Sequence, residues 1–452
     1  MEVIGVLGII AAFVFLFYFS YKGANLAWLS LLACLIIIVT NGMPVLSTIS
    51  DVVMSGVAAQ AANLMLIYLM GGILGALFVN SGAASAFALG MLDLFGKSAS
   101  EKQRQTIGII IAFVIGAILT YCGVDNFSVI FTMIAIISSI MRDTDIPRKY
   151  LPVLLITPTA IGALLPGSLY IASLVAGEVL GVRSTSGVIP GLIAGAFVAV
   201  LSVIYLQKMI SRDREKGLKW AEAADGPLAI QRRDDRAPHP VVAVLPLLAI
   251  VITYNALHLP AFAALALGIL LAVILFFPYL KAPEHYTGNR IFGKLNGLMN
   301  SFNLGADNAG IPCVMLISFG LASCIQASPA YTIISDFFVG LSLPAAISLA
   351  LVSTILVGAS CGPAGMMIAA MLAANTFIPA GMITAQAAFR ILVTTSTVFD
   401  DLPCFPGPAT IMKLTGVTFK EGYRPVGMTT LLFTAIAVVI VTVIYVIFPG
   451  VI

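Results

Sequence analysis

The stretch Gly358-Ala-Ser-Cys-Gly-Pro-Ala-Gly365 separates two apolar runs of the chain, residues 344–358 and 366–378. Glycine and proline are the strongest local signals for the end of a helix, so the chain is expected to turn here. A second polar interruption, residues 120–126, divides the apolar segment 106–141 in the same way. We therefore expect two helical hairpins, each of which enters and leaves an apolar layer on one side.

The composition of the chain indicates that this apolar layer is a lipid bilayer. Of the 452 residues, 60% are apolar and 10% are charged, against roughly 45–50% and about 25% in soluble domains. The mean hydropathy is +1.07. These values exclude a soluble enzyme, a nucleic-acid-binding protein and a disordered scaffold. Many apolar runs reach the ~17–25 residues that cross a bilayer, so the sequence predicts an all-α polytopic membrane protein.

A charged stretch, residues 208–240, divides the chain into nearly equal halves, and we interpret it as a solvated cytoplasmic linker between two repeats, 1–207 and 241–452. The halves share five short motifs in the same order and at nearly constant offset. The pairs are Ser81-Gly-Ala83 with Ser328-Pro-Ala330, Cys122-Gly123 with Cys361-Gly362, Ile146-Pro147 with Ile378-Pro379, Thr157-Pro-Thr159 with Thr395-Ser-Thr397, and Leu165-Pro166 with Leu402-Pro403. Paired interruptions in two halves are typical of transporters built from internal repeats.

The basic residues predict the orientation of the chain. With both hairpins re-entrant, each half has five crossings, and this odd number inverts one half relative to the other. Cytoplasmic loops carry an excess of Lys and Arg. With the N-terminus outside, 21 of the 23 Lys and Arg residues lie on the cytoplasmic side, whereas Arg183 lies outside and Arg390 lies within a span. We predict two inverted repeats with about ten transmembrane helices, two of them broken, plus two re-entrant hairpins and both termini outside.

Four polar interruptions carry the candidate binding groups: residues 120–126, 157–168, 358–365 and 394–408. Non-helical backbone at membrane depth is tolerated only where protein or a water-filled cavity satisfies its polar groups, so we expect them to surround one cavity. Amides at half-helix N-termini would favour an anion, and carbonyls and hydroxyls would favour a cation or a hydroxylated ligand. The predicted substrate-binding residues are Cys122, Gly123, Asn126, Thr157, Thr159, Pro166, Gly167, Ser168, Ser360, Cys361, Gly362, Arg390, Thr395, Thr397, Asp401, Leu402 and Pro403.

Ionisable residues inside a membrane are costly, and they are therefore functional candidates. Asp125 lies at the first hairpin turn, and Asp400 and Asp401 lie in the last interruption. A carboxylate in a poorly hydrated cavity holds a proton readily, and one among carbonyls suits Na⁺, so we predict that Asp125 and Asp400 couple transport to H⁺ or Na⁺. Alternatively, Asp400 or Asp401 caps a helix that starts near Ala409. Arg390 attracts a substrate carboxylate, pairs with a buried aspartate, or extends toward the outer interface.

Several motifs resemble those of a known transporter family. They are Leu119-Thr-Tyr-Cys-Gly-Val124, Asp145-Ile-Pro-Arg148, Leu165-Pro-Gly167, Phe389-Arg390, and Asp400-Asp-Leu-Pro403 followed by Leu414-Thr-Gly416. In order and spacing, over almost the whole chain, the sequence resembles the gluconate permease (GntP-type) family of the ion transporter superfamily, including its hydroxybutyrate permease branch. The resemblance implies proton symport of small organic acid anions, such as gluconate or 3-hydroxybutyrate, across the inner membrane. It also implies a homodimer with an elevator-like transport domain.

The sequence departs from that branch at the expected binding site. The branch typically has Leu-Pro-His-Asn-Gly where this chain has Leu402-Pro-Cys-Phe-Pro-Gly407, and Gly-Ser-Ala-Ser-Gly-Gly where it has Gly358-Ala-Ser-Cys-Gly-Pro363. Its Thr-Pro-Gln is replaced by Ser168-Leu-Tyr170, and the pair Asp125-Asn126 adds polarity to a turn that is often less polar. These changes leave the fold and the transport class in place and leave the substrate open.

Other functional classes fit the sequence less well. A Na⁺-coupled carrier or an antiporter of another carboxylate on the same fold is the main alternative, because the direction of coupling leaves no mark in the sequence. A channel needs a pore lined by rings of like residues, which inverted halves with hairpins do not supply. An intramembrane enzyme needs a catalytic or metal-binding cluster, but the three histidines lie in or beside loops and the six cysteines lack CxxC spacing. We therefore expect no enzyme activity, no metal or other cofactor and no nucleic-acid partner.

Overall fold

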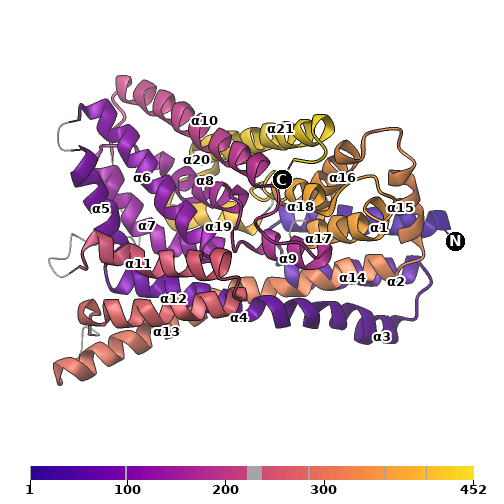
Figure 1. The fold of residues 1–452 in the computed structure, drawn as a ribbon, viewed down its shortest axis with the longest axis horizontal. Coiled ribbons are helices and arrows are strands. Elements are labelled where there is room, and N and C mark those ends of the chain that lie inside the picture. The colour runs from indigo at the N-terminus through magenta and orange to yellow at the C-terminus, as the bar shows by residue number, and fades with distance from the viewer. Residues whose placement is uncertain are drawn as a thin grey trace.

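The computed structural model describes residues 2–96, 99–220, 237–282, 286–360, 363–403 and 405–451. Within these ranges the chain forms helices and no strand (Figure 1). The all-α class predicted from the sequence is therefore confirmed.

The first half starts with two antiparallel helices and ends with a long one. Its helices are α1 (Glu2–Tyr21), α2 (Leu26–Thr40), α3 (Val45–Ser47), α4 (Met54–Asn80), α5 (Ala83–Gly96), α6 (Glu101–Tyr121), α7 (Asn126–Asp143), α8 (Leu151–Leu164), α9 (Ile171–Leu180) and α10 (Val188–Glu215). A π-helical segment joins α3 to α4, so that residues 45–80 form one continuous helix.

The second half repeats this order of elements. Its helices are α11 (Pro240–Val251), α12 (Ala261–Phe276), α13 (Arg290–Met315), α14 (Phe319–Ala327), α15 (Ala330–Val339), α16 (Ala345–Ser360), α17 (Pro363–Leu372), α18 (Ala385–Ser396), α19 (Pro406–Thr415), α20 (Phe419–Val426) and α21 (Phe433–Ile447). Each half thus contains a helix pair, a long helix, a short helix, a hairpin, a broken helix and a final helix. The division into two inverted repeats, 1–207 and 241–452, stays a prediction.

Seven helices of the described chain are long and apolar enough to cross a membrane. Six of them are crossings in the predicted topology, and the seventh is α6, which that topology assigns to the first hairpin. The other predicted crossings are the short helices α2 and α11 and the broken pairs α8–α9 and α18–α19. Four of the ten predicted crossings are therefore short or interrupted helices.

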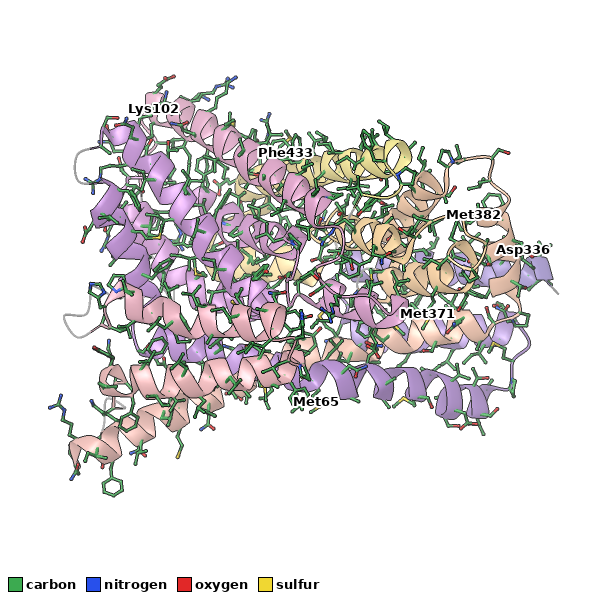
Figure 2. All side chains as sticks on the ribbon, in the orientation of Figure 1. Met65, Lys102, Asp336, Met371, Met382 and Phe433 are labelled. Carbon is green, nitrogen blue, oxygen red and sulfur yellow. The ribbon has the colours of Figure 1, made fainter. Side chains whose placement is uncertain are left out.

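The outward faces of these helices are apolar. Exposed side chains include Val14 on α1, Ile274 on α12 and Val439 on α21, each about 60% exposed. In Figure 2 the charged Lys102 and Asp336 lie toward opposite ends of the molecule, with the exposed Met65 between them. Apolar surface on this scale is rare on soluble monomers, so we assign it to contact with lipid.

The two hairpins approach each other from opposite ends of the molecule. In Figure 1, α6 and α7 lie at one end and α16 and α17 at the other, with the breaks of the two interrupted helices between them. Gly123 makes the first hairpin turn: its φ is +87°, and the Val124 N–H donates back to the Leu119 carbonyl at 3.1 Å. This left-handed turn is the common way in which glycine ends a helix.

Prolines and one glycine set the positions of the breaks. The backbone of Leu165 is extended, because the residue before a proline disfavours the helical region, and α8 therefore ends at Leu164. Gly167 then adopts a φ of +83°, which favours glycine. In the second half, α19 starts at Pro406, after the extended residue Phe405, and proline is well tolerated in the first turn of a helix.

The long helices α4 and α13 pack backbone against backbone. A Cβ atom added at Gly72 would lie 2.3 Å from the Gly305 carbonyl oxygen, and one added at Gly305 would lie 2.4 Å from the Ile73 Cα. Small residues allow this close approach between membrane helices. The contact joins the two halves of the chain along their longest helices.

Gly305→Ala is expected to separate α4 from α13, because the added methyl group would meet backbone atoms that have no room to move. Overpacking of this kind typically costs about 1–3 kcal/mol. Gly310→Ala, in the same helix, is the matched control, because nothing lies within 4 Å of the added Cβ. Thermal unfolding of the purified variants in detergent should give a lower Tm for Gly305→Ala only, and equal values would contradict the packing argument.

Candidate functional site

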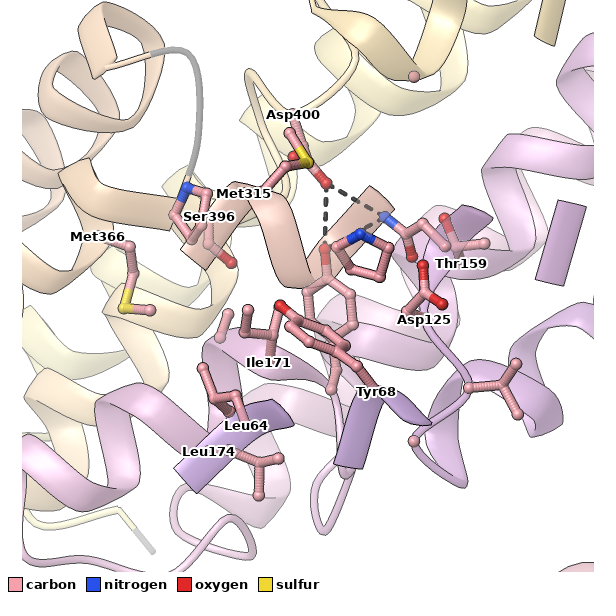
Figure 3. Close-up of a pocket in the computed structure, with 18 of the residues that line it drawn as sticks. Leu64, Tyr68, Asp125, Thr159, Ile171, Leu174, Met315, Met366, Ser396 and Asp400 are labelled. Carbon is pink, nitrogen blue, oxygen red and sulfur yellow. Dashed lines mark hydrogen bonds between the residues drawn. The ribbon is translucent and has the colours of Figure 1, made fainter. Parts of the chain in front are cut away.

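A cavity of about 130 Å³ lies where the first hairpin turn meets the helix breaks (Figure 3). Its wall is formed by α4, the turn 123–126, α8, α9, α13, the start of α17 and the segment 396–407. Most of this wall is apolar, and Leu64, Ile171 and Met366 are examples. The polar groups are therefore concentrated in one part of the cavity.

Asp400, Tyr170 and Asn126 form a connected polar cluster in this cavity, drawn with dashed lines in Figure 3. The Tyr170 hydroxyl donates to Asp400 Oδ2 at 3.1 Å, and Asn126 Nδ2 lies 3.4 Å from the same oxygen and 3.3 Å from the Tyr170 hydroxyl. Asn126 Oδ1 is buried and has no hydrogen-bond partner among the described residues. The cluster thus holds one carboxylate with two donors and keeps one acceptor oxygen for a ligand.

Two more carboxylates line the same cavity. Asp125 Oδ2 accepts a hydrogen bond from the Ser128 hydroxyl, one turn into α7. The main-chain carbonyl of Asp401 accepts from the Tyr423 hydroxyl at 2.8 Å, which ties the second break to α20. Helix α19 begins after Phe405, and no side chain caps it, so Asp400 and Asp401 do not serve as caps.

The cavity therefore carries acidic groups without basic ones. Asp125, Asp400 and Asp401 line it, and no Lys, Arg or His is among its described lining residues. Like charges in a poorly hydrated site disfavour each other's ionised form, and a proton or a bound cation relieves this repulsion. The chemistry of this lining is therefore suited to a cation or to protons.

Six residues predicted from the sequence line the cavity, and they come from three separate segments. The residues are Gly123, Asp125, Asn126, Thr159, Asp400 and Asp401. Asn126 and Asp400 are 274 positions apart in the chain. The structure thus brings together the first hairpin turn, the middle of α8 and the second break. Cys361 and Gly362, which the sequence analysis also selected, lie outside the described residues.

Other predicted residues have partners elsewhere. The Thr157 hydroxyl lies 2.7 Å from that of Thr429, the Thr395 hydroxyl lies 2.6 Å from that of Ser353, and the Ser360 hydroxyl accepts from the Gly365 N–H. These hydroxyls hold neighbouring segments together. Eight further predicted residues are also not among the described residues that line the cavity. They are Cys122, Pro166, Gly167, Ser168, Arg390, Thr397, Leu402 and Pro403.

Comparison with known proteins identifies the family of the chain. Residues 1–277, more than half of the sequence, match the profile of the family described as GntP family permease. The chain belongs to this family. It is 22% identical to the "Uncharacterized transporter YxjC" of Bacillus subtilis (strain 168), over 94% of this chain and 96% of that one. The resemblance drawn from the motifs is confirmed, and the chain is a membrane transporter.

A solved transporter structure shares the fold of this permease. The Alcanivorax borkumensis YdaH transporter, described as having an unusual topology, matches with a TM-score of 0.54 over 88% of each chain. Its sequence identity to the permease is 13%, so the likeness concerns the fold alone. The family match and the Bacillus subtilis relative are the comparisons that indicate a transporter.

Two tyrosines of the permease cavity were not predicted from the sequence. Tyr170 and Tyr68 both line the cavity (Figure 3). Tyr170 is part of Ser168-Leu-Tyr170, a stretch in which the chain departs from the branch that it resembles. This departure could have indicated that Tyr170 belongs to the site. Tyr68 lies in the largely apolar α4 and has no comparable signal, because the direction of its side chain depends on how that helix is rotated.

Arg390 lies outside the cavity lining and binds main-chain carbonyls. Its side chain is 0% exposed. The guanidinium donates to Leu164 O at 3.0 Å, to Ser186 O at 2.7 and 3.2 Å, and to Ser184 O at 3.4 Å. No carboxylate of the described residues pairs with it. Its charge therefore satisfies carbonyls at the end of α8 and in the loop before α10, where helical partners are lacking.

Arg390→Met is expected to destabilise the permease, because each buried carbonyl left unpaired costs about 1–3 kcal/mol. Arg290→Met is the matched control, since Arg290 is exposed at the start of α13. The measurement is thermal unfolding in detergent, combined with the yield of monodisperse protein. An Arg390→Met variant that unfolds at the wild-type temperature and yet loses substrate binding would assign the arginine to the substrate instead.

Proposed function

We propose that this permease is a secondary active transporter that moves small organic acid anions, such as gluconate or 3-hydroxybutyrate, together with protons. The cavity described above would be its substrate site, and the bacterial inner membrane its location. The observation that carries the proposal is the presence of three carboxylates, and no basic side chain among the described lining residues, in one small cavity between apolar helices. Intramembrane carboxylates of this kind mark ion pathways and proton relays.

The charge of the cavity supports coupling to a cation. An anionic substrate beside three aspartates would meet repulsion that is strong in a site with few water molecules. Protons bound to the aspartates remove this repulsion and also let a carboxyl group donate a hydrogen bond to the substrate. Substrate and protons would therefore bind with positive coupling, which is the requirement for symport.

The arrangement of helices supports alternating access by an elevator-type motion. The pairs α1–α2 and α11–α12, with the closely packed α4 and α13, would form a fixed frame in the bilayer. The hairpins α6–α7 and α16–α17 and the two broken helices contact one another and would move as one bundle with the cavity. A homodimer, as the resemblance implies, would hold the two frames still against each other.

Na⁺ coupling is the second candidate, and one observation favours it. Asn126 Oδ1 is buried without a partner beside Asp125 and Asp400, and amide and carboxylate oxygens are suitable ligands for a hard cation. An antiporter with the same site would bind the same ligands. Transport assays distinguish these mechanisms directly.

The test is uptake of labelled gluconate and 3-hydroxybutyrate by proteoliposomes under an imposed pH gradient or an imposed Na⁺ gradient. Accumulation driven by the pH gradient supports proton symport, and accumulation driven by Na⁺ alone supports the second candidate. Counterflow that saturates with substrate would distinguish a carrier from a channel. If folded protein moves neither acid under any gradient, the proposed substrate class is wrong.

Asp400→Asn is expected to abolish accumulation against a gradient, because the amide cannot bind and release a proton. Exchange of substrate between the two sides needs no net proton movement, so counterflow should persist. Asp336→Asn is the matched control, because Asp336 is exposed on α15 (Figure 2), and no residue of α15 is among the described residues that line the cavity. Full gradient-driven accumulation by a folded Asp400→Asn variant would remove Asp400 from the coupling mechanism.

A further inference from the structure

We propose that a second cavity, on the other side of α9, is an outer binding site that captures a small hydroxy-carboxylate before it reaches the central cavity. The inference rests on the proposed function, because it takes its ligand from the proposed substrate class. The second cavity has a volume of about 310 Å³. It lies between α9, the loop that follows α9 and the connection between α11 and α12.

Arg183 gives this cavity a positive rim, and His258 lies beside it. Arg183 Nη1 lies 3.0 Å from His258 Nε2, and both side chains are exposed. His258 is held there by a left-handed backbone, with a φ of +56°. No carboxylate of the described residues forms an ion pair with Arg183. A guanidinium with unshared N–H groups is well shaped for a carboxylate.

The inner part of the cavity carries polar atoms that lack partners. The Ser173 hydroxyl is buried, with the residue only 1% exposed, and has no hydrogen-bond partner in the described part of the chain. Asn255 Oδ1 is also buried and unpartnered, although its Nδ2 donates to Gly167 O and to the Tyr121 hydroxyl. Buried polar groups are nearly always paired, so these two atoms indicate a ligand or water that donates and accepts hydrogen bonds.

The cavity also contains one acidic residue. Glu178 lines it and is exposed, and its Oε1 accepts a hydrogen bond from Asn63 Nδ2, on α4. The positive charge of the cavity lies at Arg183, and its unpartnered hydrogen-bonding atoms lie at Ser173 and Asn255. A short acid with hydroxyl groups matches both features: its carboxylate would pair with Arg183 and its hydroxyls would reach the two unpartnered atoms.

The position of the cavity relates it to transport. Leu174, on α9, lines both cavities, so a single side chain separates the two spaces at that point. The predicted topology places the loop with Arg183 and the connection with His258 on the outer side. An acid held between them would lie next to the central site, on the side from which uptake begins.

The experiment measures protection of an engineered cysteine by the acid. Thr185 lines the outer cavity, and Thr185→Cys would react with a sulfonated maleimide that cannot cross the membrane. The rate is measured in proteoliposomes of defined orientation, with and without gluconate or 3-hydroxybutyrate. The same measurement is made with Arg183→Ala or Asp400→Asn added. Thr332→Cys, exposed on α15, is the matched control.

We expect either acid to slow labelling of Thr185→Cys and of its Asp400→Asn derivative, and to leave Thr332→Cys unaffected. Adding Arg183→Ala should raise the acid concentration needed for half-protection about tenfold or more. Uptake by Arg183→Ala should show a higher KM from the outer side at an unchanged maximal rate.

Two results would overturn the outer site: protection that persists unchanged without Arg183, or no protection of Thr185→Cys by either acid in vesicles that take the acid up. Protection without any uptake would instead overturn the proposed transport function and leave the outer site in place. If neither protection nor uptake is found, both are wrong for this ligand class.

Discussion

Main-chain polar groups at membrane depth must find partners, and the two helix breaks of this permease depend on that requirement. The break after α8 shows how it is met. Arg390 donates to the carbonyl of Leu164, and the Tyr121 hydroxyl donates to that of Pro166. The Gly167 N–H donates to Ser184 O. These bonds fix an irregular segment in place, and the cavity is formed by the segments that they hold.

Local chemistry explains how much of this fold the sequence predicts. Gly123, Pro166 and Pro406 act through their own backbone preferences, so the hairpin turn and the breaks can be located from sequence alone. The direction in which a side chain points cannot be predicted in this way. Thr157 and Thr159 are two positions apart on α8, yet Thr157 bonds Thr429 and Thr159 lines the cavity. The contacts of these two side chains depend on how α8 is rotated against helices that are distant in the sequence. No local sequence pattern predicts that rotation.

The charges of the site have a consequence for the path of an anion. The aspartates line the central cavity, whereas Arg390 binds carbonyls of the loop that follows α9 and Arg183 lines the outer cavity. An anion would be attracted to the outer cavity and repelled by the central cavity until protons or a cation bind to the aspartates. Under the proposed mechanism, this order of charges couples entry of the substrate to the ion gradient, because the site is favourable only when both are present.

Ser184 links the helix break after α8 to the outer cavity, which it lines. Its carbonyl accepts from Arg390 and from the Gly167 N–H, while its hydroxyl donates to the Tyr254 hydroxyl. Ser184 and its neighbour Arg183 belong to the proposed moving bundle, whereas Tyr254 and His258 belong to the α11–α12 pair of the proposed frame. An elevator motion would therefore break the contacts of Ser184 and Arg183 with the frame and carry Arg390 along with the bundle. The outer cavity would then exist in one state only, so a ligand bound there would favour the arrangement seen in this structure and oppose movement of the bundle until it passes α9.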